Sequence, residues 1–250
     1  ICSGLVGSEM CIRDSSDPEP ENKIESTMIG MILAAGKGHR MKPITDKMPK
    51  ALIQINNYSL IDLAIRKFKR FGIKKIIVNV SYLSEMIETH IDQQYSNENI
   101  VILREDYPYG TGGALLNAYP ELNDQPFLLM NADVLSKIDL SKLPQGTNFA
   151  HLIATHNPDH NNNGDFSIDN DVVFINENQN DFTWSGISII NPKILIPHLG
   201  KSYPFDLWKD ILIPLVDDKK ITAHHDDEFW VDVGNSDRLA LARKHFKEEN

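Results

Sequence analysis

Short apolar runs alternate with amphipathic stretches along the first half of the chain. Apolar residues dominate Met31 to Ala34, Lys75 to Val80 and Ile100 to Leu103, and runs of this length are typical of strands buried in a parallel sheet. Between them, apolar residues recur at helical spacing from Leu60 to Phe71, and Ser84 to Tyr95 is a second predicted helix with Ser84 as its N-cap. The alternation predicts a doubly wound, mostly parallel α/β sheet with ligands at the carboxyl ends of its strands.

The second half of the chain shows patterns of a different kind. Asp169-Asn170-Asp171 separates two short extended stretches, which is a hairpin signal. We therefore expect an antiparallel extension beside the parallel sheet. A closing amphipathic helix is expected over Asp237 to Phe246, capped by Asn235 or Ser236. The predicted strands of this half are Phe127 to Met130, Phe149 to Thr155, Asp165 to Ile168, Val172 to Ile175 and Asp181 to Ile190.

The loop after the first predicted strand combines glycines with cations. Ala35-Gly36-Lys37-Gly38 follows the strand, and Arg40 and Lys42 stand beside it. Glycines let the backbone approach an anion closely, and successive N–H groups in such a turn form an anion-binding nest. The Walker A pattern is absent, and Met41 stands where a dinucleotide fingerprint needs its third glycine. The loop is therefore predicted to bind a polyphosphate, through a motif that differs from these two.

Three further stretches carry candidate chemistry. Gly110-Thr111-Gly112-Gly113 precedes an apolar segment, and by itself it indicates only a flexible helix start. The strand over Phe127 to Met130 ends in Asn131-Ala132-Asp133. A carboxylate at a strand end, beside phosphates, is a natural Mg²⁺ ligand. The third stretch, Phe229 to Gly234, holds Asp232 between a tryptophan and a glycine.

Together these stretches resemble the motifs of the sugar-1-phosphate nucleotidyltransferases. The string LAAGKGHRMKPIT followed by PKAL is similar to the family signature L-x-x-G-x-G-x-R-(M/L)-x-P-(L/I)-T followed by P-K. The resemblance implies a Rossmann-like fold in which the loop backbone contacts the nucleotide, Arg40 steadies the triphosphate and Lys50 reaches the reacting phosphates. The loop residues implied are Ala34, Ala35, Gly36, Lys37 and Gly38.

The same resemblance gives roles to the other stretches. Pro108 to Gly113 matches a segment that lies against the nucleotide base in this family, and Glu105 matches an acidic position just before it. FWVDVG resembles the family's W-x-D-x-G, whose aspartate is the second Mg²⁺ ligand. The resemblance therefore implies Mg²⁺ as the cofactor, held by Asp133 and Asp232. It implies nucleotide contacts at Glu105, Gly110, Gly112 and Asn131.

Two stretches resemble, more narrowly, segments of the N-acetylmuramate-1-phosphate uridylyltransferases. One is Asn157-Pro158-Asp159-His160 followed by Gly164-Asp165-Phe166, and the other is Thr183 to Ile187. The resemblance implies that the antiparallel extension lies on the sugar side of the site. The sugar contacts it implies are Gly164, Asp165 and Gly186.

For function, the resemblance implies transfer of a nucleoside monophosphate from UTP to N-acetylmuramate 1-phosphate. Pyrophosphate would leave, and the product would serve cell-wall recycling. A mannose-1-phosphate guanylyltransferase, or another hexose-1-phosphate member, is the alternative. A non-catalytic nucleotide-sugar-binding regulatory subunit is a further alternative, disfavoured because Arg40, Lys50, Asp133 and Asp232 are all present. The missing third glycine disfavours a dinucleotide oxidoreductase.

Composition narrows the expected partners and compartment. A formal net charge of −10 argues against non-specific nucleic-acid binding, and no apolar run approaches the length of a membrane span. Both cysteines, Cys2 and Cys11, lie in the first segment, which excludes a disulfide framework and fits a reducing compartment. The histidines repeat no recognised zinc spacing, so we expect no metal there. We expect a cytoplasmic monomer or small homo-oligomer without nucleic-acid or membrane partners.

Residues 1–27 differ in character from the rest of the chain. They show no helical or strand period, and SEMCIRDS resembles translated sequencing-adapter read-through. We expect them to be a non-native or disordered tail and Met28 to be the start. Residues 28–250 are expected to form a single nucleotidyltransferase domain. No hexapeptide repeats follow in this sequence, so we expect the acyltransferase extension of some relatives to be absent or missing from it.

Overall fold

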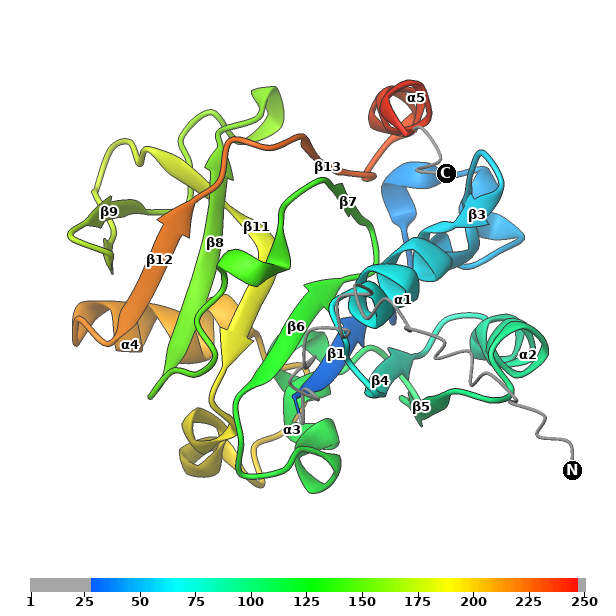
Figure 1. Cartoon of the computed structure of the whole chain (residues 1–250), viewed down its shortest axis with the longest axis horizontal. Helices are drawn as coiled ribbons and strands as arrows, with labels where there is room; N and C mark the ends of the chain where they lie inside the picture. Colours follow the sequence, from blue (N-terminus) through cyan, green and yellow to red (C-terminus); the bar gives the residue numbers. More distant parts are fainter. Residues whose placement is uncertain (1–27, 247–250) are drawn as a thin grey trace, which may run out of the picture.

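The computed structural model describes residues 28–246, so the expectation for residues 1–27 lies outside the described part of the chain. A nine-stranded sheet runs through the molecule, with helices on both faces (Figure 1). In spatial order the strands are β5 (Asn99–Arg104), β4 (Lys75–Val80), β1 (Ile29–Leu33), β6 (Phe127–Asn131), β11 (Phe182–Ile190), β8 (Ala150–His156), β12 (Ile221–His225), β10 (Val172–Phe174) and β9 (Ser167–Asp169).

The first half of the sheet is parallel, as the apolar runs predict. β1 pairs with both β4 and β6, which sets Met31 opposite Ile77 on one side and Leu129 on the other. All three side chains are fully buried. β5 extends this half as a further parallel strand beside β4. The carboxyl ends of these strands therefore meet at one edge, where a ligand site is expected.

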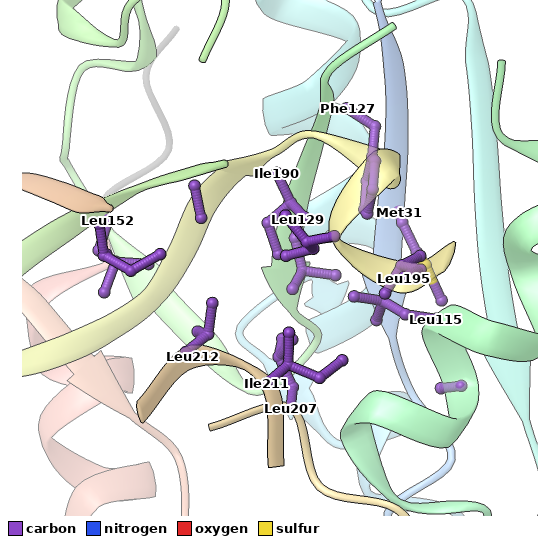
Figure 2. Close-up of a cluster of buried hydrophobic side chains, with 14 of the residues drawn as sticks. Met31, Leu115, Phe127, Leu129, Leu152, Ile190, Leu195, Leu207, Ile211 and Leu212 are labelled. Carbon is purple, nitrogen blue, oxygen red and sulfur yellow. The ribbon is translucent and has the colours of Figure 1, made fainter. Parts of the chain in front are cut away.

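Helices cover the two faces of the sheet because successive strand residues point to opposite sides. Ile32 and Leu128 belong to the cluster covered by α1 (Leu60–Arg70) and α2 (Ser84–Gln94). Met31 and Leu129 belong to the cluster on the other face, covered by α3 (Gly110–Ala118) and α4 (Ile213–Asp217). A 3₁₀ segment, Pro192–His198, and a π-helical turn, Trp208–Leu212, complete that second layer. Figure 2 shows their Leu195 and Leu212 packed in the same cluster as Leu129.

The second half of the sheet carries the predicted antiparallel extension. β11 runs antiparallel to both β6 and β8, while β12 lies parallel to β8. β9 and β10 form the predicted hairpin, whose turn passes through Asn170 and Asp171 at φ values of 48° and 65°. β9 begins at Ser167 rather than Asp165, because the N–H groups of Asp165 and Phe166 donate to Phe182 O at the start of β11 instead of pairing with β10.

Two short ladders and α5 (Ser236–His245) complete the described fold. β7 (Val134–Ser136) pairs with β13 (Trp230–Asp232), and β2 (Gln54–Ile55) pairs with β3 (Tyr58–Ser59). The sequence patterns predicted neither ladder, since each arm has at most three residues. Leu239 of α5 shares a buried cluster with Met41, which lies in the 3₁₀ turn that follows the glycine loop. No helix within residues 28–246 has the length and apolarity needed to span a membrane.

Two predicted helix caps have different outcomes. The Asn235 side chain accepts the Arg238 N–H at 2.9 Å and caps α5, which confirms one of the two predicted caps. The prediction for Ser84 is wrong. Leu83 holds the cap position of α2 in the left-handed region at φ 51°, and the Ser84 N–H donates to Ser81 O. A preceding turn, rather than a side-chain cap, therefore leads into this helix.

Candidate active site

The glycine loop begins where β1 ends. The Ala34 N–H donates to Asn79 Oδ1 at 2.9 Å, which fixes the first turn of the loop against β4. Gly38 has φ 64°, a left-handed conformation that favours glycine. A Cβ at Gly38 would lie 2.9 Å from the Thr45 side chain, and the Thr45 hydroxyl donates to Gly38 O at 2.8 Å. The loop shape thus depends on glycine at this position.

A cavity of about 440 Å³ opens at the carboxyl ends of β1 and β6. Of the predicted nucleotide and metal residues, Lys37, Gly112 and Asp232 do not line it. Lys37 is exposed, and Gly112 packs against the backbone of Asp206 and Leu207, so its small size serves helix packing. A larger cavity of about 810 Å³, between α1, β7 and α5, contains none of the predicted site residues. The lining of the smaller cavity includes the predicted residues Ala34, Ala35, Gly36, Gly38, Arg40, Lys50, Glu105, Gly110, Asn131 and Asp133.

Asn79 joins the glycine loop to the second glycine cluster, and the sequence patterns missed it. Its Nδ2 donates to Glu105 Oε1 at 2.7 Å, and Glu105 Oε2 accepts the Tyr109 N–H at 2.9 Å. Burial raises the pKa of Glu105, although these two donors oppose that effect. A polar residue inside the apolar run KIIVNV was the signal that could have found Asn79.

Asp133 lines the other end of the cavity, and a second carboxylate, Asp232, lies next to it. Asp133 follows β6 and forms an ion pair with Lys50, while Asp232 ends β13. The Val233 N–H donates to Asp133 O at 2.8 Å, so the β7–β13 ladder brings the two aspartates together from distant parts of the chain. Burial raises the pKa of Asp232, and the neighbouring Asp133 adds to this effect. Two neighbouring carboxylates, one of which lines the cavity, are a donor set that fits Mg²⁺.

Asp232 has two partners that the sequence patterns missed. Arg238, in the first turn of α5, places Nη1 2.5 Å from Asp232 Oδ1. The same Nη1 lies 2.6 Å from His160 Nε2. Burial lowers the pKa of His160, and because a guanidinium only donates, the ring nitrogen accepts its N–H. The signal for Arg238 was its position three residues after a helix cap that closely follows Asp232.

The predicted sugar-side residues lie next to this cluster but do not line the cavity. Asp165 accepts hydrogen bonds from the Trp184 N–H and from Asn161 Nδ2, so both carboxylate oxygens hold the loop together. Gly164 has φ 65°, and Gly186 has φ 77° beside Asn131. The structure thus shows loop-forming roles for these residues, and their contact with a sugar stays a prediction.

The histidines form two groups on β8 and β12. His151 Nε2 lies 2.8 Å from His224 Nδ1, and burial lowers the pKa of His151 to about 4. His156 and His225 both face Asp227, with all three ligand atoms within 4.8 Å of one another. The sequence spacing did not reveal this second group, because its members meet only through strand pairing. That the histidines bind no metal stays a prediction.

Comparisons with known proteins agree with the geometry. Residues 29–168 match the family model described as nucleotidyl transferase. The chain is 34% identical over 233 residues to N-acetylmuramate alpha-1-phosphate uridylyltransferase of Neisseria meningitidis serogroup B, covering 86% of this chain and 97% of that protein. It is 26% identical to mannose-1-phosphate guanyltransferase of Neurospora crassa, over 83% of this chain and 61% of that protein.

A solved structure supports the fold. A Bacillus anthracis protein described as a glucose-1-phosphate thymidylyltransferase, in complex with a sucrose, superposes with a TM-score of 0.75 at 20% identity. The superposition covers 89% of this chain and 96% of that one. It confirms the predicted Rossmann-like, mostly parallel α/β fold, and the family model with the relatives confirms the predicted enzyme class. The chain belongs to the nucleotidyl transferase family and is a sugar-1-phosphate nucleotidyltransferase.

Proposed function

We propose that this enzyme transfers UMP from UTP to N-acetylmuramate 1-phosphate and releases pyrophosphate. One observation carries the mechanism: the glycine loop, Lys50 and Asp133 line one cavity at the carboxyl ends of β1 and β6, and the β7–β13 ladder brings Asp232 next to Asp133. The choice of acceptor and base rests on the meningococcal relative, which aligns with the present chain over nearly its whole length.

The reaction brings two anions together, and the proposed roles follow from that difficulty. An oxygen of the sugar phosphate attacks the α-phosphorus in line, and pyrophosphate leaves on the opposite side. The nucleophile is already an anion, so positioning and charge stabilisation carry the catalysis. The backbone from Ala34 to Gly38 and the Arg40 guanidinium hold the triphosphate. Lys50, half-buried beside Asp133, offsets the charge that develops at the reacting phosphates.

Asp133 and Asp232 are the proposed Mg²⁺ ligands. The bound ion would supply positive charge to the phosphate oxygens. Lys50 and Arg238 each form an ion pair with one of these carboxylates. The cost of placing two carboxylates side by side is therefore offset by two fixed cations.

The nucleobase of the triphosphate is proposed to lie between Glu105, Gly110 and Asn131, which all line the cavity. Asn79 and the Tyr109 N–H already occupy one lone pair on each oxygen of Glu105. Glu105 therefore offers only its remaining acceptor capacity, and Asn79 sets its orientation. Gly112 is proposed to act indirectly, by letting α3 pack closely beneath the base segment.

Transfer of GMP to mannose 1-phosphate is the second candidate. The aligned region of the fungal mannose-1-phosphate guanyltransferases spans 83% of this chain but only 61% of their own length. A uridylyl product would place the enzyme in cytoplasmic cell-wall recycling, whereas a mannosyl product would place it in glycan synthesis. We propose a monomer or small homo-oligomer for either activity.

A pyrophosphate-release screen tests this proposal. The purified protein would be supplied with Mg²⁺, each of UTP, GTP and dTTP, and each of four acceptors: N-acetylmuramate, N-acetylglucosamine, mannose and glucose 1-phosphates. We expect UTP with N-acetylmuramate 1-phosphate to give the highest kcat/KM and N-acetylglucosamine 1-phosphate to follow. A higher kcat/KM for GTP with mannose 1-phosphate would overturn the muramate assignment.

A further inference from the structure

The acceptor side of the site lacks cations in the stretches that were predicted to form it. Residues 157–166 and 183–187 contain neither lysine nor arginine. A sugar 1-phosphate must nevertheless approach a triphosphate, and that approach needs positive charge on both sides of the reacting phosphorus. The positive charge on the acceptor side must therefore come from another part of the chain.

Arg238 is a cation that the fold brings to this position, and it pairs directly with both Asp232 and His160. Its side chain is only 12% exposed, and its guanidinium lies between Asp232 and His160 of the acceptor-side loop. Gly234 lines the cavity, and a Cβ at Gly234 would collide with Arg238 Nη2. The absence of a side chain at Gly234 thus leaves the guanidinium next to the cavity.

The hydrogen bonds of Arg238 leave donors for a ligand. Its contacts with Asp232 and His160 both use Nη1, and the buried Nε has no hydrogen-bond partner among the described residues. A guanidinium presents five N–H donors in a planar fork that matches phosphate oxygens. Burying such a group with donors unused is costly unless an anion completes its surroundings.

The two carboxylates are matched by two cations, so that each aspartate forms one ion pair. Lys50 pairs with Asp133, and Arg238 pairs with Asp232. If both carboxylates bind a divalent cation, their negative charge is shared with that ion, and each side-chain cation is less fully neutralised by its aspartate. Lys50 would then turn to the phosphates on its side, and Arg238 would need a replacement anion on the acceptor side.

We propose that Arg238 binds the 1-phosphate of the acceptor sugar, with His160 holding the guanidinium in place. The proposal rests on the sugar-1-phosphate chemistry of the enzyme but not on the identity of the sugar. It makes Arg238 a substrate-binding residue for the phosphate that attacks. Asp232 keeps the guanidinium aligned before the acceptor enters.

Binding measured without turnover tests the proposal. The wild type and the Arg238→Gln, Arg238→Lys and Lys244→Gln variants would be saturated with Mg²⁺ and α,β-methylene-UTP, which cannot react. N-acetylmuramate 1-phosphate would then be titrated by calorimetry, or mannose 1-phosphate with α,β-methylene-GTP if the screen selects that pair. Lys244→Gln removes the same charge from an exposed position of α5 and serves as the control.

We expect Arg238→Gln to weaken acceptor binding at least tenfold, while the Kd of the nucleotide analogue and the Mg²⁺ half-saturation change less than threefold. Arg238→Lys should recover part of the loss, and Lys244→Gln should behave as the wild type. An equal weakening of Mg²⁺, nucleotide and acceptor binding would overturn the proposal, because Arg238 would then only support Asp232.

The dephosphorylated sugar separates the phosphate from other groups on the acceptor. Free N-acetylmuramic acid, or mannose for the other pair, would be tested as a competitor of the acceptor. We expect its Ki to be the same in wild type and Arg238→Gln, because it lacks the 1-phosphate. A Ki that rises as much as the acceptor Kd would overturn the proposal and assign Arg238 to the sugar or its carboxylate. Wild-type turnover in the screen is independent of both outcomes, so failure of the activity and failure of this inference are distinguishable.

Discussion

The proposed nucleotide and acceptor sides of the site are built in different ways. On the proposed nucleotide side, Ala34, Ala35, Gly36 and Gly38 of the glycine loop line the cavity, and the shape of the loop depends on the left-handed Gly38. On the proposed acceptor side, side chains from separate elements meet next to the cavity, with His160 from a loop, Asp232 from β13 and Arg238 from α5. A backbone wall suits the phosphates that every nucleoside triphosphate shares. Assembled side chains suit the features in which sugars differ.

This difference explains why motifs indicate the reaction better than the substrate. A backbone nest needs consecutive small residues, so it leaves a continuous string in the sequence. The proposed acceptor side needs only that particular side chains lie close together in the fold. Because these residues are far apart in the chain, they form no continuous sequence motif. The comparison also predicts that changes on the two sides affect different kinetic constants.

The largest expected effect comes from the two carboxylates, where the sides meet. Asp133→Asn and Asp232→Asn each remove a proposed Mg²⁺ ligand while keeping its shape. We expect kcat to fall by orders of magnitude, on the order of several kcal/mol of lost charge stabilisation. The fold should survive, since neither residue belongs to a hydrophobic core, although Asp232→Asn should lower the melting temperature because it removes the anionic partner of the buried Arg238. The exposed Asp92→Asn is the control, and unchanged turnover in either site variant would refute the metal assignment.

Gly38→Ala tests the backbone wall of the nucleotide side. The new Cβ would press against the Thr45 side chain. An alanine at this position would also have to adopt the left-handed φ of Gly38, a strain that costs about 1–3 kcal/mol. We expect the KM for the nucleoside triphosphate to rise about tenfold while the KM for the acceptor stays within threefold. Gly146→Ala, where the nearest atom would be 3.9 Å away, serves as the control. An unchanged nucleotide KM would show that the loop tolerates the distortion.

Some parts of the fold and site were predictable from the sequence, and the reasons are local. The buried strands show as apolar runs, and the strand-end position of Asp133 follows directly from one of them. Asn79, His160 and Arg238 were missed because each acquires its role through a contact with a distant residue. Ser84 was misassigned because a left-handed Leu83 takes the cap position, and no local pattern indicates that conformation.

The stability of the half of the sheet that contains β8 and β12 should depend on acid pH more than that of the half that contains β1 and β4. Burial, with His224 as a smaller cause, lowers the pKa of His151 to about 4. An unfolded histidine takes up its proton near pH 6.5, so stability is fully present above that pH and is lost as pH falls towards 4. For this half-buried ring we expect a loss of about 1–2 kcal/mol at pH 5, after discounting for solvent screening.

Urea unfolding at pH 7.5 and pH 5 measures this loss, and amide hydrogen exchange locates it. Protection should fall in β8 and β12 before β1 and β4. His151→Gln should remove most of the pH dependence, whereas the exposed His39→Gln should not. Equal loss of protection in both halves would contradict the comparison.

The smallest expected effect concerns acceptor selectivity. Asn161 Nδ2 donates to Asp165 and to Thr183, so it shapes the acceptor-side loop. Replacing Asn161 to Asn163 with alanine should narrow the preference for N-acetylmuramate over N-acetylglucosamine 1-phosphate about three- to fivefold, on the scale of one neutral hydrogen bond. The KM for UTP should not change. A change in the UTP KM alone would place this loop on the nucleotide side.

The most direct test of the central claim is a competition in a single reaction. UTP, GTP, N-acetylmuramate 1-phosphate and mannose 1-phosphate would be supplied together at equal concentrations with Mg²⁺, and the nucleotide sugars formed would be identified by mass spectrometry. The proposed function predicts UDP-N-acetylmuramate as the dominant product, with mixed products such as GDP-N-acetylmuramate below it. GDP-mannose as the dominant product would contradict it.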